Sequence, residues 1–190
     1  MATWGVRVTL GCADDAPLVA QLQIDAVLVA YGQIFPASAP PPLFDEVLAE
    51  WRDRLDGDVA TTLVATDGGR VVGVVVAGPD LVQRDRGHVA RFYVAPDRWG
   101  QGIGSRLYVA ALDRLRRAHY REATLWVLER NVRARAWYER LGWRSTGERQ
   151  TVYEPAGIAE LQYLIRLAES LEHTVVGVDP PAPHDPSTAP

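Results

Sequence analysis

The 190-residue sequence contains no lysine, a single cysteine and no long apolar run that is free of charge. A P-loop is excluded, because its phosphate-binding lysine is obligatory. Cys12 alone cannot form an intramolecular disulfide, which fits a reducing compartment. The sequence also shows neither a membrane-spanning run nor a basic-then-apolar leader, so we expect a cytoplasmic protein with no membrane contact.

The hydrophobic content of 47 % is enough for one globular domain with a sizeable core, and 190 residues are too few for two ordinary domains. The C-terminal stretch "DPPAPHDPSTAP" is too rich in proline and too poor in apolar residues to pack. We therefore expect one folded domain over residues 1–170 and a Pro-rich, disordered tail over residues 171–190.

The net charge of -4 is distributed unevenly along the chain. Between Arg98 and Arg140 lie ten arginines and four acidic residues, a local net charge of +6, so the rest of the chain carries -10. A solvated, arginine-rich helix face would explain this segment, and so would a site for a small polyanion. Because the excess is confined to one segment of an acidic protein, we do not expect nucleic acid as a partner.

The spacing of apolar residues predicts the order of strands and helices. The runs "TTLVAT" and "RVVGVVVAG" flank Asp67-Gly68-Gly69 and indicate a hairpin. Asp14 or Asp15 is expected to cap the first helix. We expect strands over about 6–10, 61–66, 70–78, 88–95, 123–128, 149–153 and 161–167, and helices over about 15–31, 44–55, 102–115 and 134–141.

The stretch "PDRWGQGIGSRL" places three glycines at a predicted strand-to-helix junction. A helix start presents unpaired amides and the positive end of the helix dipole, and glycines let a phosphate approach them. A tight turn with close helix-to-sheet packing would need the same glycines. A dinucleotide-binding fold does not fit, because G-x-G-x-x-G is not matched and the stretch follows a hairpin in mid-chain.

Two longer stretches resemble the GNAT superfamily of acyl-CoA-dependent N-acyltransferases. "FYVAPDRWGQGIGSRL" is similar to the strand, loop and helix that bind coenzyme A, and "LWVLERNVRARAWYERLGW" is similar to the next strand plus the N-x-x-A-x-x-x-Y-x-x-x-G-[FW] helix. The resemblance covers about residues 4–168. It implies an α+β fold with a mixed, mostly antiparallel sheet of about seven strands, flanked by four helices. The fourth and fifth strands would splay apart around the pantetheine arm.

The resemblance also implies which residues bind acetyl-CoA, the expected co-substrate. Strand backbone at Phe92, Tyr93 and Val94 would contact the pantetheine arm and the thioester. The pyrophosphate would lie on the loop formed by Gly100, Gln101, Gly102, Ile103, Gly104 and Ser105. Asn131 matches a residue near the pantetheine arm, and asparagine is also a good helix N-cap. Trp99 departs from the family, which usually has Gln or Arg there, so one polar contact would be lost.

Tyr138 matches the general acid usual in the family, while its place on the apolar face of a helix would also suit a core tyrosine. Its phenol would protonate the departing thiolate, with nearby arginines lowering its pKa. His88 falls where some members place a glutamate base on the fourth strand, and a surface histidine at a strand start is the alternative. The branch that acetylates ribosomal-protein N-termini has a glutamate base where Trp126 stands here, which argues against that substrate.

An alkylammonium of pKa near 10.4 loses its proton at pH 7 at a cost of about 4.6 kcal/mol, so a base or a water chain is needed. We expect an acetyl-CoA-dependent N-acetyltransferase that transfers the acetyl group directly to a primary amine. The acceptor, a small molecule or a peptide, would be held over the loop from Tyr31 to Leu43, and Cys12 would have no role as a nucleophile. No histidine cluster suggests a metal, and a homodimer is compatible with the resemblance. The alternative is a non-catalytic acyl-CoA-binding sensor, against which the intact Tyr138 argues.

Overall fold

The computed structural model describes residues 5–167, so the predicted tail over residues 171–190 lies outside the described residues. The helices are α1 (Ala16–Tyr31), α2 (Phe44–Asp56), α3 (Ile103–Arg117) and α4 (Val132–Arg140). The strands are β1 (Arg7–Leu10), β2 (Thr61–Asp67), β3 (Arg70–Pro79), β4 (Gly87–Val94), β5 (Glu122–Leu128), β6 (Arg144–Tyr153) and β7 (Ile158–Arg166). Short 3-10 turns lie at Ala13–Asp15, Pro96–Arg98 and Glu154–Ala156.

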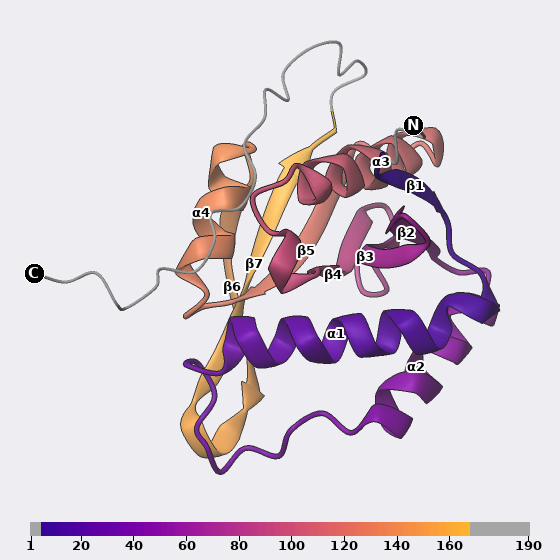
Figure 1. The fold of residues 1–190 in the computed structure, drawn as a ribbon. Coiled ribbons are helices and arrows are strands. Elements are labelled where there is room, and N and C mark those ends of the chain that lie inside the picture. Colours follow the sequence, from indigo (N-terminus) through magenta and orange to yellow (C-terminus); the bar gives the residue numbers. More distant parts are fainter. Residues whose placement is uncertain (1–4, 168–190) are drawn as a thin grey trace, which may run out of the picture.

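The seven strands form one mixed sheet in the order β1-β2-β3-β4-β5-β7-β6. Every neighbouring pair is antiparallel except β4 with β5, which are parallel. Helices α1 and α2 cover one face of the sheet, and α3 and α4 lie on the other (Figure 1). The chain therefore has a three-layer arrangement with one hydrophobic core on each side of the sheet.

Strand β3 lies in the middle of the first half of the sheet, and this position explains its nearly continuous run of valines. Val72 and Val75 belong to the core beneath α3, whereas Val71, Val74 and Val76 belong to the core beneath α1 and α2. All five side chains are buried. A strand covered on both faces is apolar throughout, because neither set of alternating side chains meets water.

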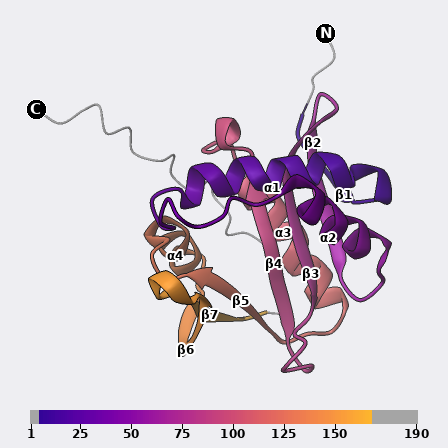
Figure 2. The ribbon, with the colours of Figure 1, turned by 90° about the horizontal axis from the view of Figure 1, so that it is seen from below.

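Strands β4 and β5 pair at only two positions, Gly87 with Ala123 and His88 with Thr124. Figure 2 shows the two strands close together at one end and diverging along their length. Between Ala90 and Tyr93, β4 also carries one more residue than the facing part of β3, which is a β-bulge. Arg91 lies in this bulge with φ +50°, an uncommon conformation for a residue other than glycine. Beyond His88, the β4 backbone therefore has no strand neighbour on its β5 side.

The predicted α+β fold is confirmed, with its four helices, its seven strands and the splaying of the fourth and fifth strands. Strand β6 begins five residues earlier than predicted, because its exposed residues show no apolar alternation.

The expected side-chain cap of the first helix is wrong. Asp15 occupies the N-cap position, but its carboxylate accepts a hydrogen bond from the Cys12 backbone N–H (2.9 Å), since a 3-10 turn precedes the helix.

The packing of α3 on the sheet gives a prediction at Gly73. A Cβ there would lie 2.7 Å from Leu107 Cδ1 and 3.3 Å from the Tyr93 carbonyl oxygen. We expect Gly73→Ala to lower the free energy of unfolding in urea by about 1–3 kcal/mol, the usual cost of overpacking. Gly5→Ala is the matched control, because its Cβ would meet no heavy atom within 4 Å. Equal stability of the two variants would contradict close contact between α3 and β3.

Candidate active site

Two cavities meet where β4 and β5 separate. The larger cavity has a volume of about 670 Å³ and is lined by the C-terminal end of α1, by β4 and by α4. The smaller cavity has a volume of about 360 Å³ and adds residues of α2, β5 and β7. Both are lined by Tyr31, Phe92, Tyr93, Asn131, Ala134 and Tyr138. Because these six residues are common to both cavities, molecules bound in the two would approach each other there.

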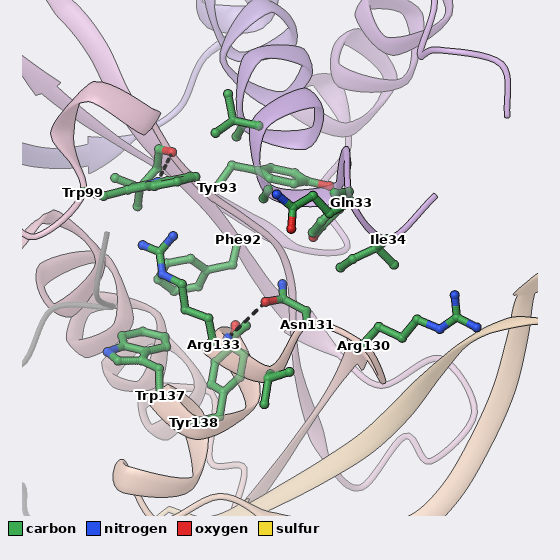
Figure 3. Close-up of a pocket in the computed structure, with 17 residues that line it drawn as sticks. Gln33, Ile34, Phe92, Tyr93, Trp99, Arg130, Asn131, Arg133, Trp137 and Tyr138 are labelled. Atoms are coloured by element: carbon green, nitrogen blue, oxygen red, sulfur yellow. Dashed lines mark hydrogen bonds between the residues drawn. The ribbon is translucent and has the colours of Figure 1, made fainter. Parts of the chain in front are cut away.

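Figure 3 shows the larger cavity, with side chains from three parts of the chain turned toward one space. Phe92 and Tyr93 come from β4, Gln33 and Ile34 from the segment after α1, and Asn131 from the start of α4. The wall is mainly aromatic and aliphatic, with a few polar groups. This composition is typical of a cavity that holds a small organic molecule.

The structure separates the ten predicted cofactor-binding residues into two groups. Phe92, Tyr93, Val94 and Asn131 line the larger cavity. The loop residues line neither cavity: Gly100, Gln101, Gly102, Ile103, Gly104 and Ser105. Their loop follows directly after Trp99, which does line the larger cavity. A molecule that extended from this cavity past Trp99 would therefore reach the glycine loop.

The glycine loop has a conformational requirement of its own. Gly100 and Gly102 both have φ +81°, a left-handed conformation that glycine adopts without a Cβ penalty. Gly102 is the N-cap of α3, and no side chain caps the helix there. The sharp turn thus needs glycine whatever binds, and it also leaves the start of α3 without a capping side chain. Both interpretations of the glycines are compatible.

Arg133 is a positively charged group of the larger cavity that the sequence did not single out. Its guanidinium carbon lies 4.2 Å from the centroid of the Trp99 ring, a cation-π contact (Figure 3). The indole Nε1 of Trp99 in turn donates to the Val94 carbonyl oxygen (2.8 Å). Of the ten arginines between Arg98 and Arg140, Arg130 and Arg133 line the larger cavity. Trp99, which stands where the resemblance predicts Gln or Arg, therefore holds the Arg133 guanidinium beside the glycine loop.

The N-cap expected at Asn131 is present, and the residue also lies at the cavity. Its side-chain oxygen accepts from the Ala134 backbone N–H (3.1 Å) at the first turn of α4. The side chain contributes to the walls of both cavities. The cap fixes the start of the helix that carries Tyr138, so Asn131 and Tyr138 are placed by the same element.

Tyr138 lies on the buried face of α4, with 8 % of its surface exposed, and lines both cavities. Its ring packs against Trp137 and Trp143, with centroids 5.0 and 5.9 Å away. The expectation that nearby arginines lower its pKa is wrong. Burial raises the pKa of Tyr138 well above its ordinary value, and Tyr108 and Tyr93 raise it further. The phenol therefore keeps its proton at neutral pH.

His88 is half-buried, lines the smaller cavity and is not the surface residue of the alternative interpretation. Its Nδ1 lies 2.9 Å from Thr124 Oγ1, and that hydroxyl donates to Asp80 Oδ2 (2.6 Å). Burial lowers the pKa of His88 below its ordinary value, an effect that the Asp80 carboxylate partly offsets. The imidazole is thus neutral at pH 7, and the structure brings it to the same cavity as Tyr138.

Two arginines share one carboxylate at the wall of the smaller cavity. Glu50 on α2 accepts from Arg54 (2.8 Å) and from Arg91 Nε (2.9 Å), and both arginines line the cavity. Burial opposes ionisation of Glu50, yet the two guanidiniums hold its pKa below the ordinary value. The three groups together carry a net charge of +1. Glu160 on β7 lines the same cavity, so charges of both signs face it.

Sequence reasoning missed Asp80, Thr124 and the Arg54–Glu50–Arg91 group. The parallel register that places Thr124 beside His88 depends on which strands are neighbours, and local patterns do not reveal this. One usable signal was present: Thr124 and Trp126 lie two residues apart in a strand, so they share a face, and Trp126 lines the smaller cavity. A polar side chain inside the buried run "ATLWVL" needs a hydrogen-bond partner.

The described part of the chain shows no cluster of three His, Cys, Asp or Glu side chains suited to a metal ion. None of the helices within residues 5–167 has the length and apolar character required to cross a membrane. Cys12 is exposed and lies outside both cavities. The groups available for chemistry at the cavities are therefore imidazole, phenol, guanidinium, carboxylate, amide and indole side chains.

Comparison with known proteins gives a relative in sequence and solved structures with the same fold. The chain is 33 % identical over 95 residues to a probable N-acetyltransferase from Mycobacterium tuberculosis, a match that spans 50 % of this chain and about half (53 %) of that protein. The ribosomal-protein-S18-alanine N-acetyltransferase from Escherichia coli superposes with a TM-score of 0.67 at 18 % identity, over 90 % of this chain and 100 % of that one. PaiA N-acetyltransferase from Thermoplasma acidophilum, solved with coenzyme A, gives 0.62 at 12 % identity, over 83 % and 98 %.

The model of the Acetyltransferase (GNAT) family matches residues 24–143, more than half of the chain. This range contains the second helix, the hairpin, the splayed strand β4, the glycine loop and the helix with Asn131 and Tyr138. The resemblance expected from "FYVAPDRWGQGIGSRL" and "LWVLERNVRARAWYERLGW" is therefore confirmed. The chain belongs to the GNAT family of acetyltransferases.

Proposed function

We propose that the protein is an N-acetyltransferase that moves an acetyl group from acetyl-CoA directly to a primary amine. Two cavities meet at the gap between β4 and β5, and this meeting carries the proposal. A thioester entering from one cavity and an amine entering from the other would come together beside Phe92, Tyr93 and Tyr138. The amine belongs to a small molecule or a peptide, and the cytoplasm is the proposed compartment.

The larger cavity suits the acetyl-CoA side of the reaction. The β4 backbone beyond His88 has no strand neighbour toward β5, so its amide and carbonyl groups are placed to pair with the amides of a pantetheine arm as an added strand would. Arg133 beside Trp99 supplies a positive charge for phosphate, and the uncapped start of α3 supplies amides. The relative from Thermoplasma acidophilum, with the same fold, was solved with coenzyme A bound.

The smaller cavity suits the acceptor. It is lined by His88, by Arg54 and Arg91, which share the carboxylate of Glu50, and by Glu160. The cavity therefore offers partners both for an amino group and for a negatively charged group of the acceptor. Trp126 lies in its wall, and the resemblance aligns this position with the glutamate base of the ribosomal-protein branch. We therefore propose His88 on β4, and no group on β5, as the base for the amine.

Direct transfer requires the amine to lose one proton and the departing sulfur to gain one. The N–C bond forms as the C–S bond breaks, His88 accepts the amine proton, and the Tyr138 hydroxyl donates its proton to sulfur. Solvent returns a proton from His88 to Tyr138 between turnovers. Because burial raises the pKa of Tyr138 above 10, donation to a thiolate with a pKa of about 8.5 is uphill by at least about 2 kcal/mol.

The acetyl-CoA side is tested at Arg133. We expect Arg133→Met to raise the Kd of acetyl-CoA about tenfold, since a hydrogen bond to a charged group contributes about 1.5–3 kcal/mol. Arg117→Met is the matched control, because Arg117 is exposed, pairs with Asp113 and lines neither cavity. S-acetylpantetheine, which lacks the pyrophosphate, should bind wild type and Arg133→Met equally in calorimetry. An equal loss of both ligands would contradict a phosphate contact.

Tyr138 is tested by free thiol release from acetyl-CoA in the presence of a panel of amines. Tyr138→Phe keeps the ring and its packing, so we expect kcat to fall 10²-fold or more while the Kd of acetyl-CoA changes by less than threefold. Tyr108→Phe, which removes a buried hydroxyl outside both cavities, should retain kcat. Near wild-type turnover in Tyr138→Phe would reject the acid. A wild type that binds acetyl-CoA but never releases thiol would favour the sensor.

The pH profile tests His88. With an alkylamine of pKa about 10.4, the logarithm of kcat/KM falls with a slope of one as pH decreases, because the free amine is lost. A catalytic His88 must also be unprotonated, and its pKa lies below the ordinary value of 6.5. Protonation of His88 therefore lowers kcat/KM a second time, so the slope becomes two only below pH 6.5. We expect His88→Gln to keep a slope of one throughout and to bind acetyl-CoA normally. The assignment fails if His88→Gln retains the second limb.

A further inference from the structure

Three side chains from three different strands or strand ends form a hydrogen-bonded chain at the smaller cavity. His88 on β4 and Thr124 on β5 are opposite each other in the last pair before these strands separate. Asp80 directly follows β3. Thr124 Oγ1 lies 2.9 Å from His88 Nδ1 and 2.6 Å from Asp80 Oδ2. Thr124 is fully buried and Asp80 is 6 % exposed, so water does not compete readily for these bonds.

Asp80 determines which group donates and which accepts in these two hydrogen bonds. Its Oδ1 accepts from the backbone N–H groups of Val82 (2.9 Å) and Gln83 (3.1 Å), which fixes the carboxylate in place. Burial opposes its ionisation, but these bonds and the Thr124 hydroxyl hold the pKa of Asp80 below its ordinary value. An ionised carboxylate can only accept. Thr124 must therefore donate its one proton to Asp80.

A threonine hydroxyl that has donated its proton can only accept from a further neighbour. The Gly87 carbonyl oxygen competes for that proton from 3.4 Å, a longer and weaker contact than the 2.6 Å bond to Asp80. His88 Nδ1 must then carry a proton in order to bond to Thr124. The other nitrogen of the neutral ring, Nε2, is left with its lone pair.

We propose that Asp80 and Thr124 are positioning residues that hold His88 with its proton on Nδ1, so that Nε2 is the atom that accepts the proton of the acceptor amine. This inference rests on the proposed function for its catalytic part. In the step, the free amine attacks the thioester carbon and its nitrogen becomes positively charged. One N–H bond of this nitrogen then breaks and the Nε2–H bond forms, so the positive charge moves from the nitrogen to the imidazole. Asp80 stays ionised and faces the new charge through Thr124.

Other charged and titratable groups surround His88 at the smaller cavity. They are Arg54 of α2 with its partner Glu50, Arg91 of β4, Glu160 of β7, and the phenols of Tyr31, Tyr93 and Tyr138; the Arg86–Glu122 ion pair (3.0 Å) flanks the strand starts. Among these groups and Asp80, Asp80 is the one whose charge raises the pKa of His88. Removing that charge should lower the pKa of His88 further, which makes the sign of the effect testable.

The tautomer can be measured without any substrate, by the side-chain nitrogen shifts of His88 in 15N-labelled protein at pH 7.5, assigned with His88→Gln. We expect wild type to show a protonated Nδ1 and an unprotonated Nε2. Thr124→Val should shift the ring toward the Nε2–H form, and Thr124→Ser should restore the wild-type pattern. Thr62→Val is the matched control, because Thr62 is a buried threonine whose hydroxyl has no hydrogen-bond partner.

Asp80→Asn is a second, independent variant. The backbone N–H groups of Val82 and Gln83 still require an oxygen, so the new NH₂ group would face Thr124. Thr124 would then accept from Asn and donate to His88 Nδ1, which reverses the chain and places the proton on Nε2. We expect a predominantly Nε2–H ring in Asp80→Asn and a kcat/KM at least tenfold lower, with the KM for acetyl-CoA unchanged.

The outcomes separate this inference from the proposed function. A wild-type ring with its proton on Nε2 would overturn the positioning role, whether or not the protein acetylates an amine. The expected tautomers together with full kcat/KM in Thr124→Val would reject Nε2 as the proton acceptor, and hence the catalytic half of the inference. Loss of kcat/KM in Thr124→Val and Asp80→Asn, recovery in Thr124→Ser and no change in Thr62→Val would support it.

Discussion

Strands β4 and β5 are joined by only two residue pairs, and the cavities depend on their separation beyond His88 and Thr124. A buried backbone group without a partner costs about 1–3 kcal/mol, so neighbouring strands do not separate in a sheet interior without compensation. Here the bulge at Arg91 bends β4, Phe92 packs against Trp137 of α4 with centroids 5.6 Å apart, and β5 continues along β7. The gap is thus held open by packing on both sides, and its free backbone groups are available to a ligand.

One physical effect, burial, sets the protonation of both proposed catalytic groups, in opposite directions. It raises the pKa of the Tyr138 phenol and lowers the pKa of the His88 imidazole, because in each case the charged form is disfavoured away from water. Both groups are therefore neutral at pH 7. A neutral imidazole can accept a proton and a neutral phenol can donate one, so burial favours the protonation state that the proposed transfer needs in both groups, while it makes His88 a weaker base and Tyr138 a weaker acid.

The sequence predicted most of the fold, because the information needed was local. Within residues 5–167, apolar spacing located the four helices and the seven strands, β6 only over its second half, and Asp67-Gly68-Gly69 located the hairpin. It failed where the outcome depended on contacts between distant segments. The Arg133 guanidinium lies over Trp99, and Thr124 meets His88 across a parallel pair whose partners are 36 residues apart. One local contact was also missed, since the carboxylate of Asp15 accepts from the Cys12 amide three residues away. The motif predicted positions at Asn131 and Tyr138 that line the cavities, but it did not predict the burial that raises the pKa of Tyr138.

The position of His88 links the architecture of the sheet to the proposed chemistry. Thr124 reaches His88 only because these two residues are the last pair before the strands separate, and Asp80 reaches Thr124 because β3 ends beside them. One residue earlier, the pair is Gly87 with Ala123, which has no polar side chain. Beyond it, no residue of β4 has a β5 partner. The His88 side chain is therefore held by Thr124 of β5 on one side and lines the smaller cavity on the other. The same residue pair that ends the pairing of β4 with β5 also orients the proposed base.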